Sequence, residues 1–278
     1  MYCEVHAGIH ILFCAPMVST MPDKIKNTTT YDAPLLYSEL VWIWPIISPP
    51  EDYVKETVYF GRLIETQSTI PVTTLLHLGC GGGHNDFTFK KRFTVTGVDI
   101  SDPMLGLAGG LNPEAEYAAG DMRTMRLERL FDAVALLDAI NHMTVESDLR
   151  AVFLTAWEHL RPGGIFLTVN EVSPGAFVQN KLYCTSHKKD GVEIAFVENL
   201  YDPDPSDTSY EHTCLYLIRR DGELTIRSDR CLCGLFDCAL VRSLLEETGF
   251  AVEEVRPNDS DAPGLSGVTV FLCEKPPG

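Results

Sequence analysis

Short apolar runs alternate with helical stripes through the middle of the chain, from about residue 72 to residue 170. The apolar runs predict buried strands over residues 72–78, 93–98, 115–119, 131–137 and 165–169. Helices are expected over residues 52–67, and from Ser101, which can act as a cap, to Leu111. Because near-continuous apolar strands alternate with helices, the pattern predicts an α/β protein whose parallel sheet is covered on both faces.

The clearest helix follows the fourth apolar run. Its apolar side chains recur at helical spacing and form one stripe, made of Leu149, Val152, Phe153, Ala156, Trp157 and Leu160. We expect Thr144 to cap this helix and Pro162-Gly163-Gly164 to end it.

The pattern changes after residue 171. Three strand-like runs follow without helices between them, over Val192–Leu200, His212–Arg219 and Glu223–Cys233. Asp221-Gly222 between two of them is a typical hairpin turn. We therefore predict an antiparallel β insertion after the fifth strand. A helix near residues 237–248, ended by Gly249, and strands near 250–256 and 268–274 close the chain.

These elements divide the chain into four predicted parts. Residues 1–50 form an aromatic-rich N-terminal arm that covers the substrate, 51–170 the main core, 171–234 the insertion, and 235–278 the completion of the core. Met17 and Met21 are alternative starts. The apolar run over residues 9–18 lacks the preceding basic residues of a signal peptide, and no run reaches the roughly 18 apolar residues that cross a bilayer. We expect no membrane partner.

Composition narrows the partners further. The formal net charge of −17 repels phosphate backbones, so nucleic acid is not an expected partner, whereas a cationic ligand suits it. The nine cysteines are odd in number and scattered, which indicates reduced thiols and a cytoplasmic protein. Cys231, Cys233 and Cys238 lie closest together, but no second pair at zinc-site spacing is visible, so we expect no metal.

A glycine-rich turn follows the first predicted strand. Gly79-Cys80-Gly81-Gly82-Gly83 can present backbone N–H groups to a ligand, because glycine permits a tight turn and a close approach. A dinucleotide motif requires glycine at the position of His84, and a phosphate-binding P-loop requires a Gly-Lys pair that does not follow. The pattern that remains is G-x-G-x-G.

Acidic residues end the next three strands. Asp99 lies twenty residues after Gly79 and can accept hydrogen bonds from both ribose hydroxyls of an adenosine ligand. Asp121 can accept a hydrogen bond from an adenine amino group while Met122 packs on the ring. Asp138 ends the fourth strand, at the edge where open α/β sheets bind ligands.

Together these segments resemble the ordered motifs of class I S-adenosylmethionine-dependent methyltransferases. The matching segments are residues 75–84, 95–101, 120–123, 131–134 and 160–164. The resemblance implies a Rossmann-like, mostly parallel sheet of seven strands, the last antiparallel, with S-adenosylmethionine as cofactor and S-adenosylhomocysteine as product. The cofactor-binding residues it implies are His77, Gly79, Cys80, Gly81, Gly83, Asp99, Ile100, Asp121, Met122 and Asp138. His77 departs from the family, which usually has an acid at this position that helps hold the cofactor's amino group.

Within this family the chain is most similar to small-molecule N-methyltransferases, including those that act on amino sugars. They carry an aromatic N-terminal segment, an insertion after the fifth strand, and a run like residues 138–143. The Asp/Asn-Pro-Pro-aromatic signature of DNA amine methyltransferases is absent. By this likeness His142 is the candidate base and Tyr37 orients the acceptor, while Tyr31, Trp44 and Asn141 join Tyr37 in binding it.

The sequence therefore predicts methyl transfer to a small-molecule acceptor, with an amine nitrogen as the expected acceptor atom. An O-methyltransferase acting on a hydroxyl or carboxylate and a non-catalytic S-adenosylmethionine-binding protein are alternatives, and nucleotide-dependent redox chemistry is a third. A homodimer through the β insertion is left open.

Overall fold

The computed structural model describes residues 34–258, 262 and 264–277. Its main sheet has seven strands in the order β10-β11-β5-β4-β1-β2-β3. Their bounds are β1 Thr74–Leu78, β2 Thr94–Asp99, β3 Glu116–Ala119, β4 Phe131–Leu136, β5 Leu160–Asn170, β10 Ala251–Val255 and β11 Thr269–Glu274. β1 to β5 pair in parallel, and β11 runs antiparallel to both neighbours. The predicted seven-stranded α/β fold is confirmed.

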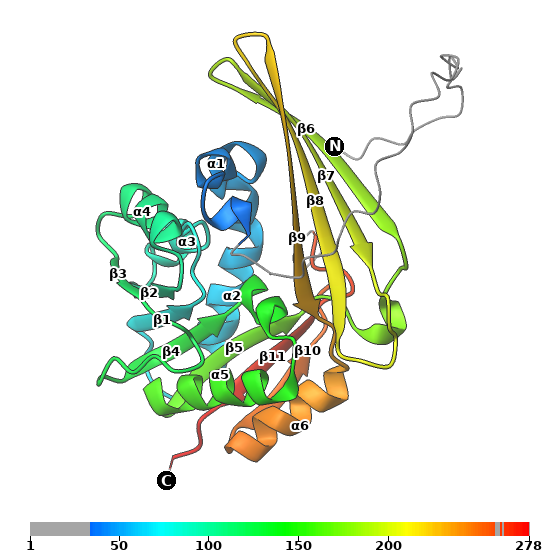
Figure 1. Cartoon of the computed structure of the whole chain (residues 1–278). Coiled ribbons are helices and arrows are strands. Elements are labelled where there is room, and N and C mark those ends of the chain that lie inside the picture. The colour runs from blue at the N-terminus through cyan, green and yellow to red at the C-terminus, as the bar shows by residue number, and fades with distance from the viewer. Residues whose placement is uncertain (1–33, 259–261, 263, 278) are drawn as a thin grey trace. The chain divides into compact units, whose positions relative to one another are not determined.

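Helices cover both faces of this sheet (Figure 1). Their bounds are α1 Trp44–Ile47, α2 Val54–Gln67, α3 Asp86–Phe89, α4 Asp102–Leu111, α5 Glu146–His159 and α6 Cys238–Thr248. β1 sends Leu76 and Leu78 into the core beneath α5 and α6, and Leu75 into a second core beneath α2. Since both faces of the strands are buried, the near-continuous apolar runs of the sequence are explained.

A second sheet follows β5. It contains β6 Lys181–Lys189, β7 Val192–Tyr201, β8 Ser209–Arg220 and β9 Glu223–Gly234, all antiparallel and in sequence order. The inner face of this sheet is apolar near the hairpin end, where Ile194 and Tyr216 pack against Leu36 and Ile43. The insertion predicted after the fifth strand is confirmed, with one strand more than expected. β6 escaped prediction because it is an edge strand whose side chains are mostly exposed, so it has no apolar run.

Short 3₁₀ segments join these layers. They are η1 Leu35–Tyr37, η2 Val41–Ile43, η3 Pro50–Tyr53, η4 Asp138–His142 and η5 Pro174–Ala176. η4 begins two residues after the last residue of β4 and packs against β9. The chain between residues 34 and 53 and the end of β4 therefore meet beside the inner face of the second sheet.

Two expected helix boundaries are wrong, and two are confirmed. α5 ends at His159, and Leu160–Gly164 already belong to β5, where Gly163 and Gly164 exchange backbone hydrogen bonds with Lys275. Thr144 does not cap α5, whose N-cap is Val145 without a side-chain bond; the Thr144 carbonyl instead accepts the Thr208 hydroxyl. The Ser101 hydroxyl accepts the Met104 N–H, and Gly249 ends α6 in a left-handed conformation.

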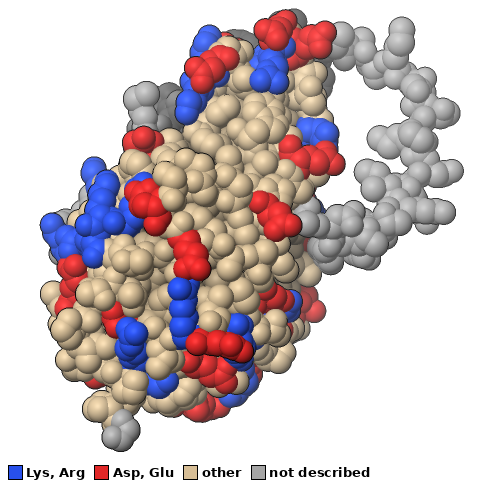
Figure 2. Space-filling model, turned by 90° about the vertical axis from the view of Figure 1, so that its left-hand side faces the viewer, with Lys and Arg blue, Asp and Glu red and all other residues tan. Residues whose placement is uncertain are grey.

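Charged side chains are interspersed on the surface. Figure 2 shows one face on which basic and acidic groups lie next to one another rather than in single-sign patches. Ion pairs such as Lys90–Glu114 at 2.9 Å and Arg129–Glu116 at 2.6 Å join opposite charges. Within the described part of the chain, no helix is both long and apolar enough to cross a membrane.

Candidate cofactor and acceptor site

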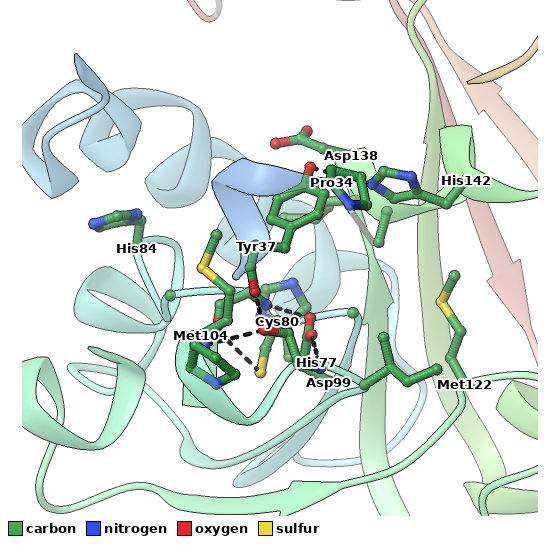
Figure 3. Close-up of a pocket in the computed structure, with 18 of the residues that line it drawn as sticks. Pro34, Tyr37, His77, Cys80, His84, Asp99, Met104, Met122, Asp138 and His142 are labelled. Atoms are coloured by element: carbon green, nitrogen blue, oxygen red, sulfur yellow. Dashed lines mark hydrogen bonds between the residues drawn. The ribbon is translucent and has the colours of Figure 1, made fainter. Parts of the chain in front are cut away.

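A cavity of about 710 Å³ opens at the carboxyl ends of β1, β2 and β4 (Figure 3). Its walls come from the glycine turn, the start of α4, the segment after β3, η4 and the N-terminal segment. The predicted site residues that line it are Tyr37, Trp44, His77, Gly79, Cys80, Gly81, Asp99, Ile100, Asp121, Met122, Asp138 and His142. Tyr31 lies outside the described residues, and Asn141 and Gly83 are not among the residues that line the cavity.

Neighbouring atoms pack closely against two glycines of the turn, whereas the space beside the third is empty. Gly79, Gly81 and Gly83 all have positive φ, at 64°, 52° and 72°. A Cβ on Gly79 would lie 2.2 Å from the Cβ of Ala139, and one on Gly83 would lie 2.6 Å from Nδ2 of Asn112. A Cβ on Gly81 would meet no atom within 4 Å. Gly81 is therefore the turn's point of close approach to whatever fills the cavity.

Cys80 fixes the glycine turn through its backbone, not through its thiol. Its N–H donates to the Val98 carbonyl at 3.0 Å, which joins the turn to β2. Its side chain is buried so close to Gly97 that a Cβ there would lie 2.7 Å from the Cys80 Sγ. Burial raises the pKa of this thiol well above its ordinary value, so it stays protonated and inert.

Asp99 stands at the end of β2 with a fixed orientation. Its two carboxylate oxygens accept the N–H groups of Gly81 and Ser101, both at 2.8 Å. The remaining lone pairs of this carboxylate stay available for hydroxyl donors. Ile100 follows as an apolar side chain that is 75% exposed at the cavity.

Asp121 and Met122 line the same wall of the cavity, but their contacts differ. Arg123 donates to both oxygens of Asp121, at 2.6 to 3.1 Å, and also to Asp148. These bonds lower the pKa of Asp121, which is ionised and already engaged with a cation. Met122 lies close to the turn, with its sulfur 3.5 Å from the position of a Cβ on Gly79.

His77 is buried beside an acid that the sequence interpretation missed. Its Nδ1 lies 2.7 Å from Oδ1 of Asp86, a fully buried residue at the start of α3. The other oxygen of Asp86 accepts the Tyr117 hydroxyl at 3.0 Å. Where the family usually has an acid, this chain has a histidine joined to an acid nine residues later. The only hint in the sequence was an acidic residue three positions after the last glycine of the turn.

Tyr37 and His142 meet across the cavity, although 105 residues separate them. The Tyr37 hydroxyl lies 3.3 Å from Nε2 of His142, and the two rings meet edge to face at 5.5 Å. Tyr37 is fixed in turn by its own carbonyl, which accepts the Ser101 hydroxyl at 2.6 Å. Burial raises the pKa of Tyr37 and lowers that of His142, so both side chains are neutral near neutral pH.

Trp44 lies over the glycine turn, and its ring centroid is 6.2 Å from that of Tyr37. A Cβ on Gly82 would be 3.3 Å from its ring. Its Nε1 donates to Nδ1 of His84, and the two rings stack with centroids 5.8 Å apart. The Tyr53 ring also stacks on the His84 ring, with centroids 5.6 Å apart. Burial lowers the pKa of His84 to about 4, so the imidazole is neutral and can accept this bond.

Carboxyl groups gather next to η4. Burial and the nearby Asp138 raise the pKa of Glu171 well above its ordinary value, and the same two causes raise that of Glu56 to about 8. Asn141 donates to Glu171 at 3.0 Å, so its amide turns to this cluster rather than into the cavity. Glu171 directly follows β5, and Asp138 lies two residues after β4. The strand-end rule that pointed to Asp138 could therefore also have found Glu171.

Comparison with known proteins agrees with this architecture. Residues 75–164 match the model of a methyltransferase domain. The dTDP-3-amino-3,4,6-trideoxy-alpha-D-glucopyranose N,N-dimethyltransferase of Streptomyces venezuelae is 30% identical over 151 residues, which are 54% of this chain. The chain thus spans 63% of that relative's length, less than two thirds.

Solved structures share the fold over most of the chain. Streptomyces venezuelae DesVI has a TM-score of 0.72 at 24% identity and covers 84% of this chain and 95% of its own. The sugar N-methyltransferase KedS8 of Streptoalloteichus has a TM-score of 0.74 at 17% identity and covers 94% of this chain and 100% of its own. Residues 75–164 thus form a methyltransferase domain, and the described chain has the class I methyltransferase fold.

Proposed function

We propose that this enzyme methylates the amine nitrogen of a nucleotide-linked amino sugar or a closely related small amine. The observation that carries the proposal is the arrangement of one cavity, which has a glycine turn with Asp99 on one side and Tyr37, His142 and Asp138 on the other. The name of the Streptomyces relative supports the acceptor class.

The described residues fit the cofactor. The open space at Gly81 leaves room for a ligand to touch the backbone, and the fixed Asp99 carboxylate can accept ribose hydroxyls. Ile100 and Met122 offer apolar surface for adenine, and when bound S-adenosylmethionine supplies a methyl group on an activated sulfonium. The residues that we propose to bind or shape this site are His77, Gly79, Cys80, Gly81, Gly83, Asp99, Ile100, Asp121, Met122 and Asp138.

His77 and Asp121 take modified roles in this proposal. Asp121 is engaged by Arg123, so it acts with that side chain as a charged pair at the cavity wall. His77 joined to Asp86 replaces the usual acid, with a buried carboxylate behind an imidazole. The pair can serve an ammonium group either directly or through water.

The acceptor side requires a base, because an amine that is protonated in water has no lone pair for the reaction. His142 is neutral and its Nε2 faces the cavity, so it can take that proton. Tyr37 orients the imidazole, and Asp138 places a carboxyl group at the cavity wall. Burial and Asp138 raise the pKa of Glu56 and Glu171, so these two neighbouring groups are mostly protonated near neutral pH. Trp44 limits the cofactor side of the cavity, and Asn141 holds Glu171 in place.

The test measures S-adenosylhomocysteine formation with nucleotide-linked 3-amino sugars and with matched sugars that carry a hydroxyl at the same carbon. We expect turnover on the amino sugars only. His142→Ala should lower turnover by at least about tenfold while S-adenosylhomocysteine affinity is unchanged. His187→Ala, on the exposed edge strand β6, is the matched control.

Each alternative predicts a different outcome. Turnover of the hydroxyl compounds would favour O-methylation, and an inert His142→Ala would favour a carboxylate acceptor. Binding of S-adenosylmethionine without any product across both sets would favour a non-catalytic role. Any of these results would reject the amine proposal.

We also propose a reduced, cytoplasmic setting and a homodimer through the second sheet. The described cysteines are all free thiols. The outer face of the sheet carries Val197, Leu215, Leu217 and Ile226, the last 58% exposed, so an apolar surface is available for self-association. Light scattering of the wild type and of Ile226→Lys tests this, and a monomeric wild type would refute it.

A further inference from the structure

A group of soft ligands lies on the inner face of the second sheet, outside the cavity wall. His212 on β8 is directly opposite Cys231 on β9, and Cys233 follows two residues later on the same face. Nε2 of His212 is 3.1 Å from Oε1 of Glu198 on β7 and 3.6 Å from Sγ of Cys214. Three strands thus bring one imidazole, three thiols and one carboxylate together.

The spacing of these atoms suits a tetrahedral metal. One ligand atom from each of His212, Cys231 and Cys233 lies within 4.8 Å of the others, and the two sulfurs are 3.9 Å apart. In a zinc site with Zn–S bonds of about 2.3 Å, neighbouring sulfurs are about 3.8 Å apart. The separation also exceeds the roughly 2.05 Å of a disulfide, so the thiols are free to act as ligands.

We propose that His212, Cys231 and Cys233 bind one Zn²⁺ ion, with Glu198 and Cys214 holding the imidazole in position. Thiolate and imidazole together are the donor set that selects zinc over hard cations such as Mg²⁺ or Ca²⁺. Cys233 is 4% exposed and Cys231 is half-buried, so the ion would be largely shielded from water.

The ion would stiffen the wall behind the acceptor site. β9 packs against η4, and a Cβ on Gly234 would lie 2.0 Å from the Met143 carbonyl oxygen. β9 also holds the N-terminal segment, because Asp229 accepts the Leu35 N–H at 2.5 Å. A metal that joins β8 to β9 therefore supports both segments that carry Tyr37 and His142 without touching the acceptor.

The experiment titrates the full chain, purified under reducing conditions, stripped with a chelator and desalted, with Co²⁺. Binding at the proposed site gives thiolate-to-cobalt charge-transfer and intense visible bands that saturate at one equivalent and disappear when Zn²⁺ is added. Glu198→Gln should weaken this binding by about tenfold or more. The readout is independent of methyl transfer, so it stands or falls separately from the proposed function.

Cys231→Ser and His212→Gln should each abolish the saturating bands, and Cys233→Ser should do the same if it folds. Cys238→Ser is the matched control, because this nearby thiol instead contacts Thr269 and Asn170. Circular dichroism checks that each variant is folded. Zn²⁺ should raise the unfolding temperature of the wild type and of Cys238→Ser, but not that of Cys231→Ser.

Three results would overturn the proposal. The first is the absence of saturating bands in the reduced wild type. The second is the same bands in folded Cys231→Ser or His212→Gln. The third is an intact mass of the isolated wild type that is lower by two hydrogens, with no such deficit in Cys231→Ser. That result would show a Cys231–Cys233 disulfide, which leaves no thiolates for the ion.

Discussion

Gly81→Ala separates the folding role of the glycine turn from its ligand role. Both Gly79 and Gly81 have positive φ, so alanine at either position costs about 1–2 kcal/mol of backbone strain. At Gly79 the new Cβ would also lie 2.2 Å from Ala139, which adds about 1–3 kcal/mol of overpacking. At Gly81 nothing is within 4 Å, so no such addition is expected.

These magnitudes predict different melting curves. With about 2 °C per kcal/mol for a chain of this size, Gly81→Ala should lower Tm by about 2–4 °C. Gly79→Ala should lower it by about 4–10 °C, from the summed strain and overpacking. Thermal unfolding followed by circular dichroism measures both.

Although Gly81→Ala should cost little stability, we expect it to weaken cofactor binding. In Gly81→Ala the extra methyl occupies space that the cofactor needs for its contact with the backbone. We expect its affinity for S-adenosylhomocysteine, measured by calorimetry, to fall by at least about tenfold, which is about 1.4 kcal/mol. A Gly81→Ala protein that binds as tightly as the wild type would refute the assignment of the cofactor to this turn.

The remaining predictions concern stability and pH. Burial raises the pKa of Asp132, but hydrogen bonds from Thr73 and Thr74 outweigh this effect and lower the pKa overall. Asp132→Asn should therefore lower the free energy of unfolding, measured in urea at pH 7, by about 2–4 kcal/mol. Because the folded pKa is depressed, that difference should be present above about pH 4 and disappear as the pH falls further; a constant difference would contradict it. Gly234→Ala, whose Cβ would meet the Met143 carbonyl, should displace η4 and lower turnover more than cofactor affinity, as paired kinetics and calorimetry would show. Burial lowers the pKa of His142, so the acidic limb of kcat/KM should lie below the ordinary histidine value of about 6.5; a limb above it would argue against His142 as base.

Local patterns predicted elements well where the chain is buried on both faces. β1, β2, β4 and α6 appear within one or two residues of their expected bounds, because periodicity and the Ser101 and Gly249 boundary residues act within a few residues. β6 was missed because an exposed edge strand has no apolar run. The end of α5 was misplaced because pairing with Lys275 draws Gly163 and Gly164 into β5, a contact from over 100 residues away.

The candidate site divides in the same way. The glycine turn and Asp99 were readable, since a strand, a turn and the next strand end are fixed by short-range geometry. Asp86 beside His77 was not, because a histidine gives no indication of which acid it will meet. Trp44 lines the cavity with its ring over Gly82 and its centroid 6.2 Å from that of Tyr37, and aromatic density in the sequence did not indicate these partners.

By itself, then, the sequence determined the α/β alternation, the position of the insertion and the place of the glycine turn. Each of these follows from residue spacing along the chain, which the backbone converts directly into faces and turns. Only the tertiary structure decided that Tyr37 meets His142 and that His212 lies opposite Cys231, with Cys233 on the same face of the sheet. Such pairs depend on strand register and on loops closed over many residues, where side-chain packing rather than local spacing selects the neighbour.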